Sequence, residues 1–216
     1  MRALGLDQPW ASLIAAGIKT IETRDWSTTY RGPLAIHANK GWKQDQHDRW
    51  LEFSDEFGPD RFPPLPEWLP PRRRRPENLP PLGAIVALAT VHDVGRFEAD
   101  PTGLPGDVRL RFDSGGVMGV PDDDHSTGDT TAGRFGWVLV RVFRLETPYP
   151  MRGRQGLWTP ELPERMDLAK APGTWANTCA HCGGKHPDDD CDDHEGATSG
   201  LPTGPDPDIR PWSFDP

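Results

Sequence analysis

Apolar and polar residues in the N-terminal part of the chain follow the pattern of short strands around one helix. Residues 1–6 and 32–38 are mainly apolar and predict two strands. Between them, residues 8–17 carry apolar side chains at helical spacing. Asp7 stands where it can cap this helix, and Gly17 stands where it can end it.

The segment 19–26 alternates between apolar and polar residues, which predicts a half-buried strand. Glu22 and Arg24 lie two positions apart on it, so both side chains leave the same face of the strand. They can therefore form an ion pair, while Lys19 supplies a further positive charge from the preceding turn.

The rest of the compact part continues in the same way. A polar helix is expected near residues 43–57, and two alternating segments, 83–97 and 135–146, predict strands that pair with each other. Five or so strands, one or two helices and no regular βαβ alternation indicate an α+β fold. We therefore expect a small β-barrel with flanking helices over residues 1–158.

Two segments interrupt this domain. Residues 59–81 hold 9 prolines in 23 positions and enclose four arginines at 72–75, so an extended surface segment that adds an electrostatic contact is expected. Residues 98–133 are rich in Gly, Asp, Thr and Pro, which predicts a long polar loop or partly disordered insertion. Its acidic run at 122–125 is expected to be solvated.

Charge is distributed unevenly. Residues 1–158 carry 20 Lys and Arg against 21 Asp and Glu, whereas residues 159–216 carry 4 against 12. The acidity thus belongs to the C-terminal tail, and a near-neutral body can still present a basic cleft to a phosphate. The sequence shows neither an apolar stretch long enough for a bilayer nor a secretion signal, so we expect a cytoplasmic protein without a membrane partner.

Several segments together resemble the ASCH domain family, whose fold is a PUA-like β-barrel. They are "LDQPWASLIAAGIKTIETRDW", "RGPLAIHA", "GAIVALATVHDV" and "FGWVL". The family pattern G-x-K-x-x-E-x-R falls on Gly17, Lys19, Glu22 and Arg24. The resemblance spans roughly residues 1–158 apart from the two inserted segments.

This resemblance implies a cleft beside the barrel that binds RNA or a modified nucleoside or nucleotide. Its predicted ligand-binding residues are Lys19, Glu22, Arg24, Trp26, Trp10 and Gln8. The two tryptophans are either stacking platforms for a base or core residues. From the residues alone, the charged motif can equally be a solvated strand face with a weak ion pair.

Some relatives are amidohydrolases that act on acylated cytidine, and others are ribonucleases. The resemblance therefore implies a second function, in which Lys19 is the catalytic base and Glu22 its partner. In the amidohydrolase type a threonine stands three positions after the lysine, where this chain has Glu22, and a carboxylate cannot act as the same hydroxyl nucleophile.

Three further basic or polar residues are considered for a role in binding or catalysis. Arg152 and Arg154 in "MRGRQGLW" can contact phosphates or stand in a solvated loop. His37, within the strand at 32–38, is expected to be a hydrogen-bonded strand histidine rather than a catalytic group.

The tail contains a cysteine and histidine motif over residues 179–194. A Cys-x-x-Cys pair, a third cysteine and two nearby histidines have the residue types of a structural zinc site, so a short metal-stapled tail is expected. The candidate ligands are Cys179, Cys182, His186, Cys191 and His194, and either histidine can complete the site. The surrounding aspartates favour a protein partner over RNA, so a protein-interaction adaptor is a third possible function.

We predict that the purified chain holds about one zinc ion, because four thiolate and imidazole ligands form a closed tetrahedral site. Elemental analysis measures the metal content, and limited proteolysis before and after chelation tests whether the tail loses protection. A metal-free chain whose tail is equally protease-labile with and without chelator would contradict the zinc site.

Overall fold

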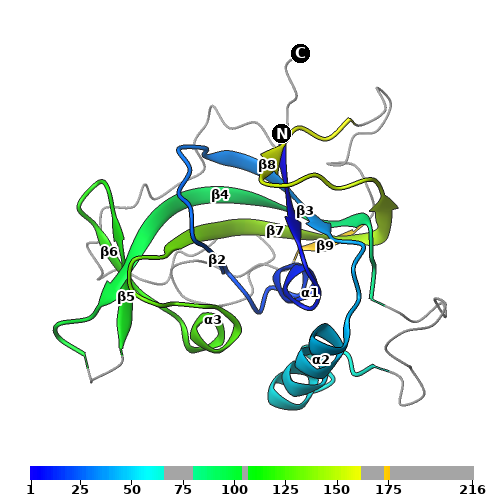
Figure 1. Ribbon diagram of the computed structural model, residues 1–216, viewed down its shortest axis with the longest axis horizontal. Coiled ribbons are helices and arrows are strands. Elements are labelled where there is room, and N and C mark those ends of the chain that lie inside the picture. The colour runs from blue at the N-terminus through cyan, green and yellow to red at the C-terminus, as the bar shows by residue number, and fades with distance from the viewer. Residues whose placement is uncertain (66–79, 104–106, 162–172, 176–216) are drawn as a thin grey trace.

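The described residues form one curled sheet with helices against it (Figure 1). The computed structural model describes residues 1–65, 80–103 and 107–161, and the backbone of 173–175. The strands are β1 (Arg2–Leu6), β2 (Ile21–Arg24), β3 (Gly32–Ala38), β4 (Ala84–Ala99), β5 (Val108–Phe112), β6 (Val117–Gly119), β7 (Phe135–Pro150), β8 (Leu157–Trp158) and β9 (Gly173–Trp175). The helices are α1 (Trp10–Ala15), α2 (Gln44–Phe57) and α3 (Asp122–Thr127).

The sheet is mixed, with the strand order β2-β7-β4-β3-β1-β8. Strands β1 and β3 run parallel, and the other neighbouring pairs along this order are antiparallel. The hairpin of β5 and β6 continues from β4, and β9 pairs with β7. This curled sheet is a half-barrel and fits the expected small β-barrel with flanking helices.

Two long strands give the sheet its curvature. Strands β4 and β7 are 16 residues each, and their pairing confirms the prediction made from the alternating segments. Their register shifts at three places along β4, between Ile85 and Ala87, between Leu88 and Thr90 and between Val91 and Asp93. Each shift bends and twists the strand pair, so the sheet curls and its two ends approach one another.

Helix α1 contacts strands β3, β4 and β7, where Ile14 joins the main core cluster with Trp137. The helix ends before Gly17, whose φ of 70° suits glycine, as predicted. Its start differs from the prediction. The Gln8 side chain accepts a hydrogen bond from the Ser12 N–H, whereas Asp7 accepts one from Asn39 outside the helix. The helix begins at Trp10, so Asp7 stands too far upstream to cap it.

The segment 98–133, expected to be a loop or partly disordered insertion, instead contains β5, β6 and α3 in its described part. Leu110 and Phe97 are buried together with Ile21, and this small cluster gives the hairpin a core of its own. Polar composition misled the prediction, because a few apolar residues at alternating positions suffice to attach a hairpin to the edge of a sheet.

The chain segment that follows the predicted domain boundary also contributes to the sheet. Strand β9 lies within the segment assigned to the tail, yet it pairs with residues 143–145 of β7. It occupies the same edge of β7 that β2 occupies further along. This pairing satisfies backbone groups that an open sheet edge would leave exposed.

Candidate functional site

Arg24 links the two ends of the curled sheet. Its guanidinium forms an ion pair with Glu22, with 3.1 Å between Nε and Oε1, which confirms that both side chains share one face of β2. The same guanidinium donates a hydrogen bond to the Gly5 carbonyl of β1, at 3.1 Å. Because β2 begins the strand order and β1 lies near its other end, this side chain spans the opening of the half-barrel.

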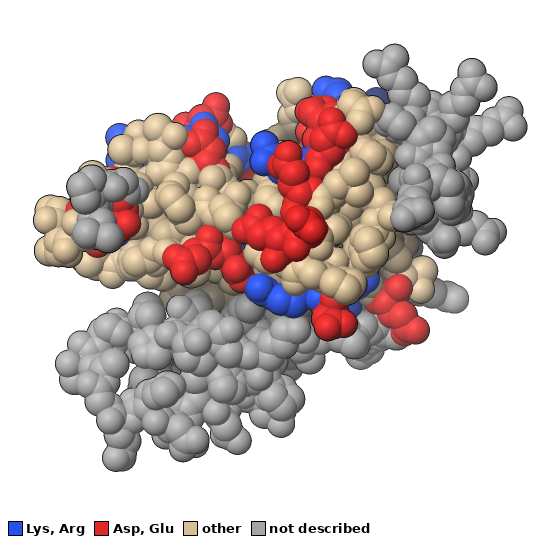
Figure 2. Space-filling model, turned by 90° about the horizontal axis from the view of Figure 1, so that it is seen from below, with Lys and Arg blue, Asp and Glu red and all other residues tan. Residues whose placement is uncertain are grey.

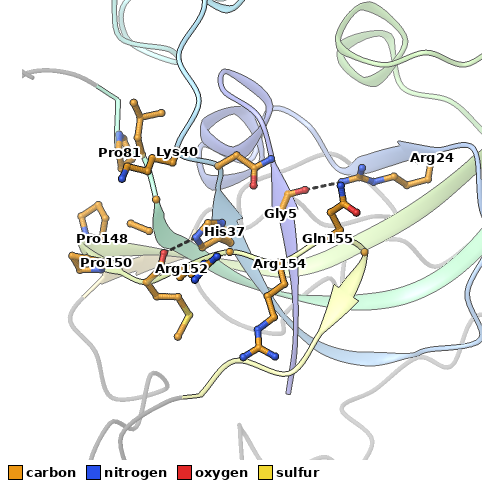
Figure 3. Close-up of a pocket in the computed structure, with 17 residues that line it drawn as sticks. Gly5, Arg24, His37, Lys40, Pro81, Pro148, Pro150, Arg152, Arg154 and Gln155 are labelled. Atoms are coloured by element: carbon orange, nitrogen blue, oxygen red, sulfur yellow. Dashed lines mark hydrogen bonds between the residues drawn. The ribbon is translucent and has the colours of Figure 1, made fainter. Parts of the chain in front are cut away.

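A cleft of about 1170 Å³ lies beside this bridge (Figure 3). Its walls come from the ends of several strands, together with the loop 151–156 between β7 and β8. Its lining residues are Gly5, Arg24, His37, Asn39, Lys40, Pro81, Leu82, Gly83, Ala84, Pro148, Pro150, Met151, Arg152, Gly153, Arg154, Gln155 and Gly156.

The charged residues of this lining are all cationic. Arg24, Lys40, Arg152 and Arg154 line the cleft, and no Asp or Glu is among its described lining residues. Lys40, Arg152 and Arg154 are exposed, whereas the Arg24 side chain is 24 % exposed. In Figure 3 Arg24 and Gln155 stand at one end of the cleft, and Lys40 lies with three prolines at the other. Such a lining attracts anions.

The floor of the cleft is held by hydrogen bonds between backbone segments and one histidine. Met151 N–H donates to the Gly83 carbonyl at 2.9 Å, and Gly83 N–H donates to the Ala38 carbonyl at 2.8 Å. His37, in β3, is buried with its Nε2 atom 3.0 Å from the Met151 carbonyl. The prediction of a hydrogen-bonded strand histidine is thereby confirmed.

Lys19 and Glu22, the predicted catalytic pair, are both buried, and neither is among the lining residues of this cleft. Lys19 is fully buried, and its Nζ has no hydrogen-bond partner among the described residues. Burial lowers the pKa of Lys19 and raises that of Glu22, because desolvation disfavours both charged forms; their mutual attraction opposes each shift in part. Perturbed groups of this kind are typical of functional sites and of structural ion pairs alike.

Asp124 corrects the expectation that the acidic run at 122–125 is solvated. Its carboxylate is buried and accepts hydrogen bonds from the Thr20 N–H and hydroxyl and from the Ile21 N–H, at 2.5–2.8 Å. Desolvation raises the pKa of Asp124, and nearby Lys19 lowers it in part. Composition could not reveal this role, because the hydrogen bonds join α3 to a turn about 100 residues earlier.

The remaining predicted ligand residues are not part of the cleft lining. Trp26 packs edge-on against Trp137, at 4.7 Å between ring centroids, and Trp10 donates its indole N–H to the Thr127 carbonyl. Gln8 is buried and bonds the Pro81 carbonyl and the Ser12 N–H. Of the six predicted ligand residues, Arg24 alone is part of the described lining.

The sequence left Arg152 and Arg154 open between phosphate contacts and a solvated loop, and the structure places both, exposed, in the lining. Sequence reasoning selected no other residue of the lining apart from Arg24 and His37. It missed Lys40 and Gln155. Lys40 stands two residues after the strand at 32–38, so its place near a strand end was the one available signal. Gln155 carried no signal, because only the loop 151–156 brings it to the cleft.

Comparison with known families gives a match for the N-terminal part of the chain. Residues 4–103 match the ASCH domain family. The match includes β1 to β4 and both α1 and α2, and the sheet continues beyond it through β7 and β8. No curated protein matches the chain. ASCH domains are in general associated with RNA binding or with hydrolase-like activity.

Three other expectations concern the zinc site, the arginine run at 72–75 and a membrane span. The five candidate zinc ligands, and the arginines at 72–75, lie outside the described residues, and the described part of the chain holds no cluster of His, Cys, Asp and Glu suited to a metal. None of the helices in the described ranges has the length and apolar character needed to span a bilayer.

We predict that Asp124→Asn lowers the free energy of unfolding by about 1–3 kcal/mol. The Asp124 carboxylate accepts three hydrogen bonds, and the amide would replace one of its two acceptor oxygens with an NH2 group that cannot accept them. Urea unfolding measures the loss. Asp123→Asn is the matched control, since the half-exposed Asp123 side chain pairs only with exposed Arg61 among the described residues and its loss should cost under about 1 kcal/mol. Equal stability of the two variants would contradict the structural role of Asp124.

Proposed function

We propose that this protein binds RNA or a nucleotide in the cleft bounded by Arg24, Lys40 and the loop 151–156. The observation that carries the proposal is the lining itself, which has four cations and no carboxylate among its described residues. In a chain whose formal net charge is −9, a concave surface of purely positive charge is a specific feature.

Two further observations support a nucleic-acid ligand. The ASCH match makes an RNA or nucleotide ligand the expected class. Arg24 is already fixed by its contacts to Glu22 and Gly5, so binding to its guanidinium costs little side-chain entropy. A guanidinium held in this way presents its remaining N–H groups in a planar fork that suits a phosphate or a carbonyl.

The double variant Arg152→Ala, Arg154→Ala should bind a short labelled RNA at least about tenfold more weakly than the wild type at moderate salt, because two phosphate contacts are lost. Fluorescence anisotropy measures the affinity. Arg49→Ala is the matched control, because Arg49 is an exposed arginine of α2 outside the cleft lining. Unchanged affinity of the double variant, or an equal loss in the control, would contradict the assignment of the cleft.

A hydrolase is the second candidate, and the environment of Lys19 favours it. A buried amine with a lowered pKa and no hydrogen-bond partner among the described residues can serve as a general base closer to neutral pH than an ordinary lysine. Glu22, with a raised pKa, is the neighbouring acid group. An acylated nucleoside and RNA are the two substrate classes that the resemblance to the ASCH family suggests.

If Lys19 is such a base, turnover of acetylated cytidine or of labelled RNA should rise with pH as the amine loses its proton. The lowered pKa places this rise below the ordinary lysine range. Lys19→Met should abolish the turnover while keeping most of the buried volume, and circular dichroism checks that the variant folds. Absence of turnover, or equal turnover in folded Lys19→Met, would remove the hydrolase.

A further inference from the structure

The cleft lacks the groups that usually recognise a base. Its described lining holds no Trp, Tyr or Phe, and its one aromatic ring, that of His37, is buried. Of its two amide side chains, Asn39 already donates to Asp7 at 2.8 Å. Stacking on aromatic rings and hydrogen bonds to base edges are the two common ways of reading a single strand, and among the amide side chains of the lining Gln155 alone is placed for the second.

The cleft is instead well supplied with exposed positive charge. Lys40 and Arg152 have no ion-pair partner among the described residues, and Arg154 pairs with Glu161 on the surface. Glu161 is 84 % exposed and Arg154 is 63 % exposed, so a phosphate can replace this weak pair at little cost. Three cations are thus available for contact with phosphates, while Arg24, already paired with Glu22, adds hydrogen bonds rather than net charge.

Another part of the surface carries mainly negative charge (Figure 2). Acidic side chains gather on the face of the molecule seen there, and the exposed carboxylates of α2 and α3 include Asp45, Asp48, Glu52, Asp55, Glu56 and Asp122. This face repels a polyanion, whereas the cleft attracts one. The charge pattern therefore favours the cleft over the exposed face of α2 and α3 as the place where a nucleic-acid strand binds.

The position of the two cleft arginines is set by the residue between them. A Cβ atom at Gly153 would lie 2.5 Å from Cε1 and 2.8 Å from Nδ1 of His37. The His37 ring cannot retreat easily, because it is buried and bonded to the Met151 carbonyl. Only glycine at this position lets the loop 151–156 pack directly on the floor of the cleft, with an arginine on each side.

We propose that the cleft binds the phosphodiester backbone of a single-stranded nucleic acid and is nearly indifferent to its bases. This inference rests on the proposed function and narrows its ligand from RNA or nucleotide to a strand with several phosphates. The volume agrees, since about 1170 Å³ is above the roughly 300–1000 Å³ of typical small-molecule pockets. Charge and loop geometry, rather than stacking, supply the affinity.

Four strands of about eight nucleotides test the ligand class, since single-strand sites commonly span this length. They are oligo(U), oligo(A), and a 2′-O-methyl strand made both with phosphodiester and with uncharged methylphosphonate linkages. We expect oligo(U) and oligo(A) to bind within about threefold of each other, because no aromatic platform favours the better-stacking base. The methylphosphonate strand should bind at least about tenfold more weakly than its charged parent, because the phosphate contacts are lost.

The salt dependence of the affinity reports the number of phosphate contacts. Three phosphate contacts predict that affinity for a single strand falls roughly 20-fold between about 50 mM and about 200 mM salt, at a slope near 0.7 per contact. Arg152→Ala, Arg154→Ala should reduce this fall to about threefold, because one contact remains.

Gly153→Ala tests the geometry without changing any charge. It should weaken binding of oligo(U) by displacing the two arginines, whereas Gly41→Ala should leave it unchanged, because a Cβ at Gly41 meets nothing within 4 Å. Thermal unfolding of both variants, together with binding measured well below the unfolding temperature, separates loss of the cleft from loss of the fold.

The outcomes separate the two proposals. Equal binding of the charged and methylphosphonate strands, a preference above about tenfold for one base, or full affinity of folded Gly153→Ala overturns the backbone inference while RNA binding stands. Absence of binding to every strand and to the mononucleotides UMP and AMP overturns both proposals.

Discussion

The side chain of Arg24 closes a sheet that its backbone alone leaves open. Strand β2 and strand β1 lie at opposite parts of the strand order, and no ladder of backbone hydrogen bonds joins them in the described sheet. Arg24 bonds the Gly5 carbonyl and pairs with Glu22, so one guanidinium serves both ends of the half-barrel. A hydrogen bond from a charged donor is typically worth about 1.5–3 kcal/mol, more than a neutral one. Since the same side chain lines the cleft, closure of the barrel and construction of the binding surface depend on a single group.

Three buried ionisable groups accompany this bridge, and burial favours the neutral form of each. Lys19, Glu22 and Asp124 are all buried, and desolvation shifts the pKa of each toward the neutral form. Asp124 offsets this cost by accepting the free N–H groups of the turn that leads into β2. Helix α3 thereby fixes the position of β2, and through β2 that of Arg24. A segment with the composition of a solvated loop is thus a structural support of the site.

The proposed binding of a polyanion rests on the separation of charge over the described surface. The tail and the exposed faces of α2 and α3 are acidic, while the described lining of the cleft is cationic throughout. Net charge therefore says little about the ligand, because a polyanion responds to the local potential within about a Debye length. The loop 151–156 contributes two of the cations and lies beyond the segment that matches the ASCH family. The cleft lining therefore combines residues inside the segment that matches the ASCH family with residues outside it.

The sequence by itself determined most of the elements. The strand at 32–38, the strands that pair as β4 and β7, the helix near 43–57 and the stop at Gly17 all follow from local periodicity and turn chemistry. It also determined that Glu22 and Arg24 share a face, because strand alternation is a local property. Tertiary structure alone decided which of the motif's side chains reach solvent. Lys19 and Glu22 are buried, whereas Arg24, on the same strand, opens into the cleft with Lys40 and Gln155. The cleft brings together residues as far apart in the chain as Arg24 and Gln155, and it depends on the curl that the register shifts of β4 and β7 impose, which no local pattern encodes.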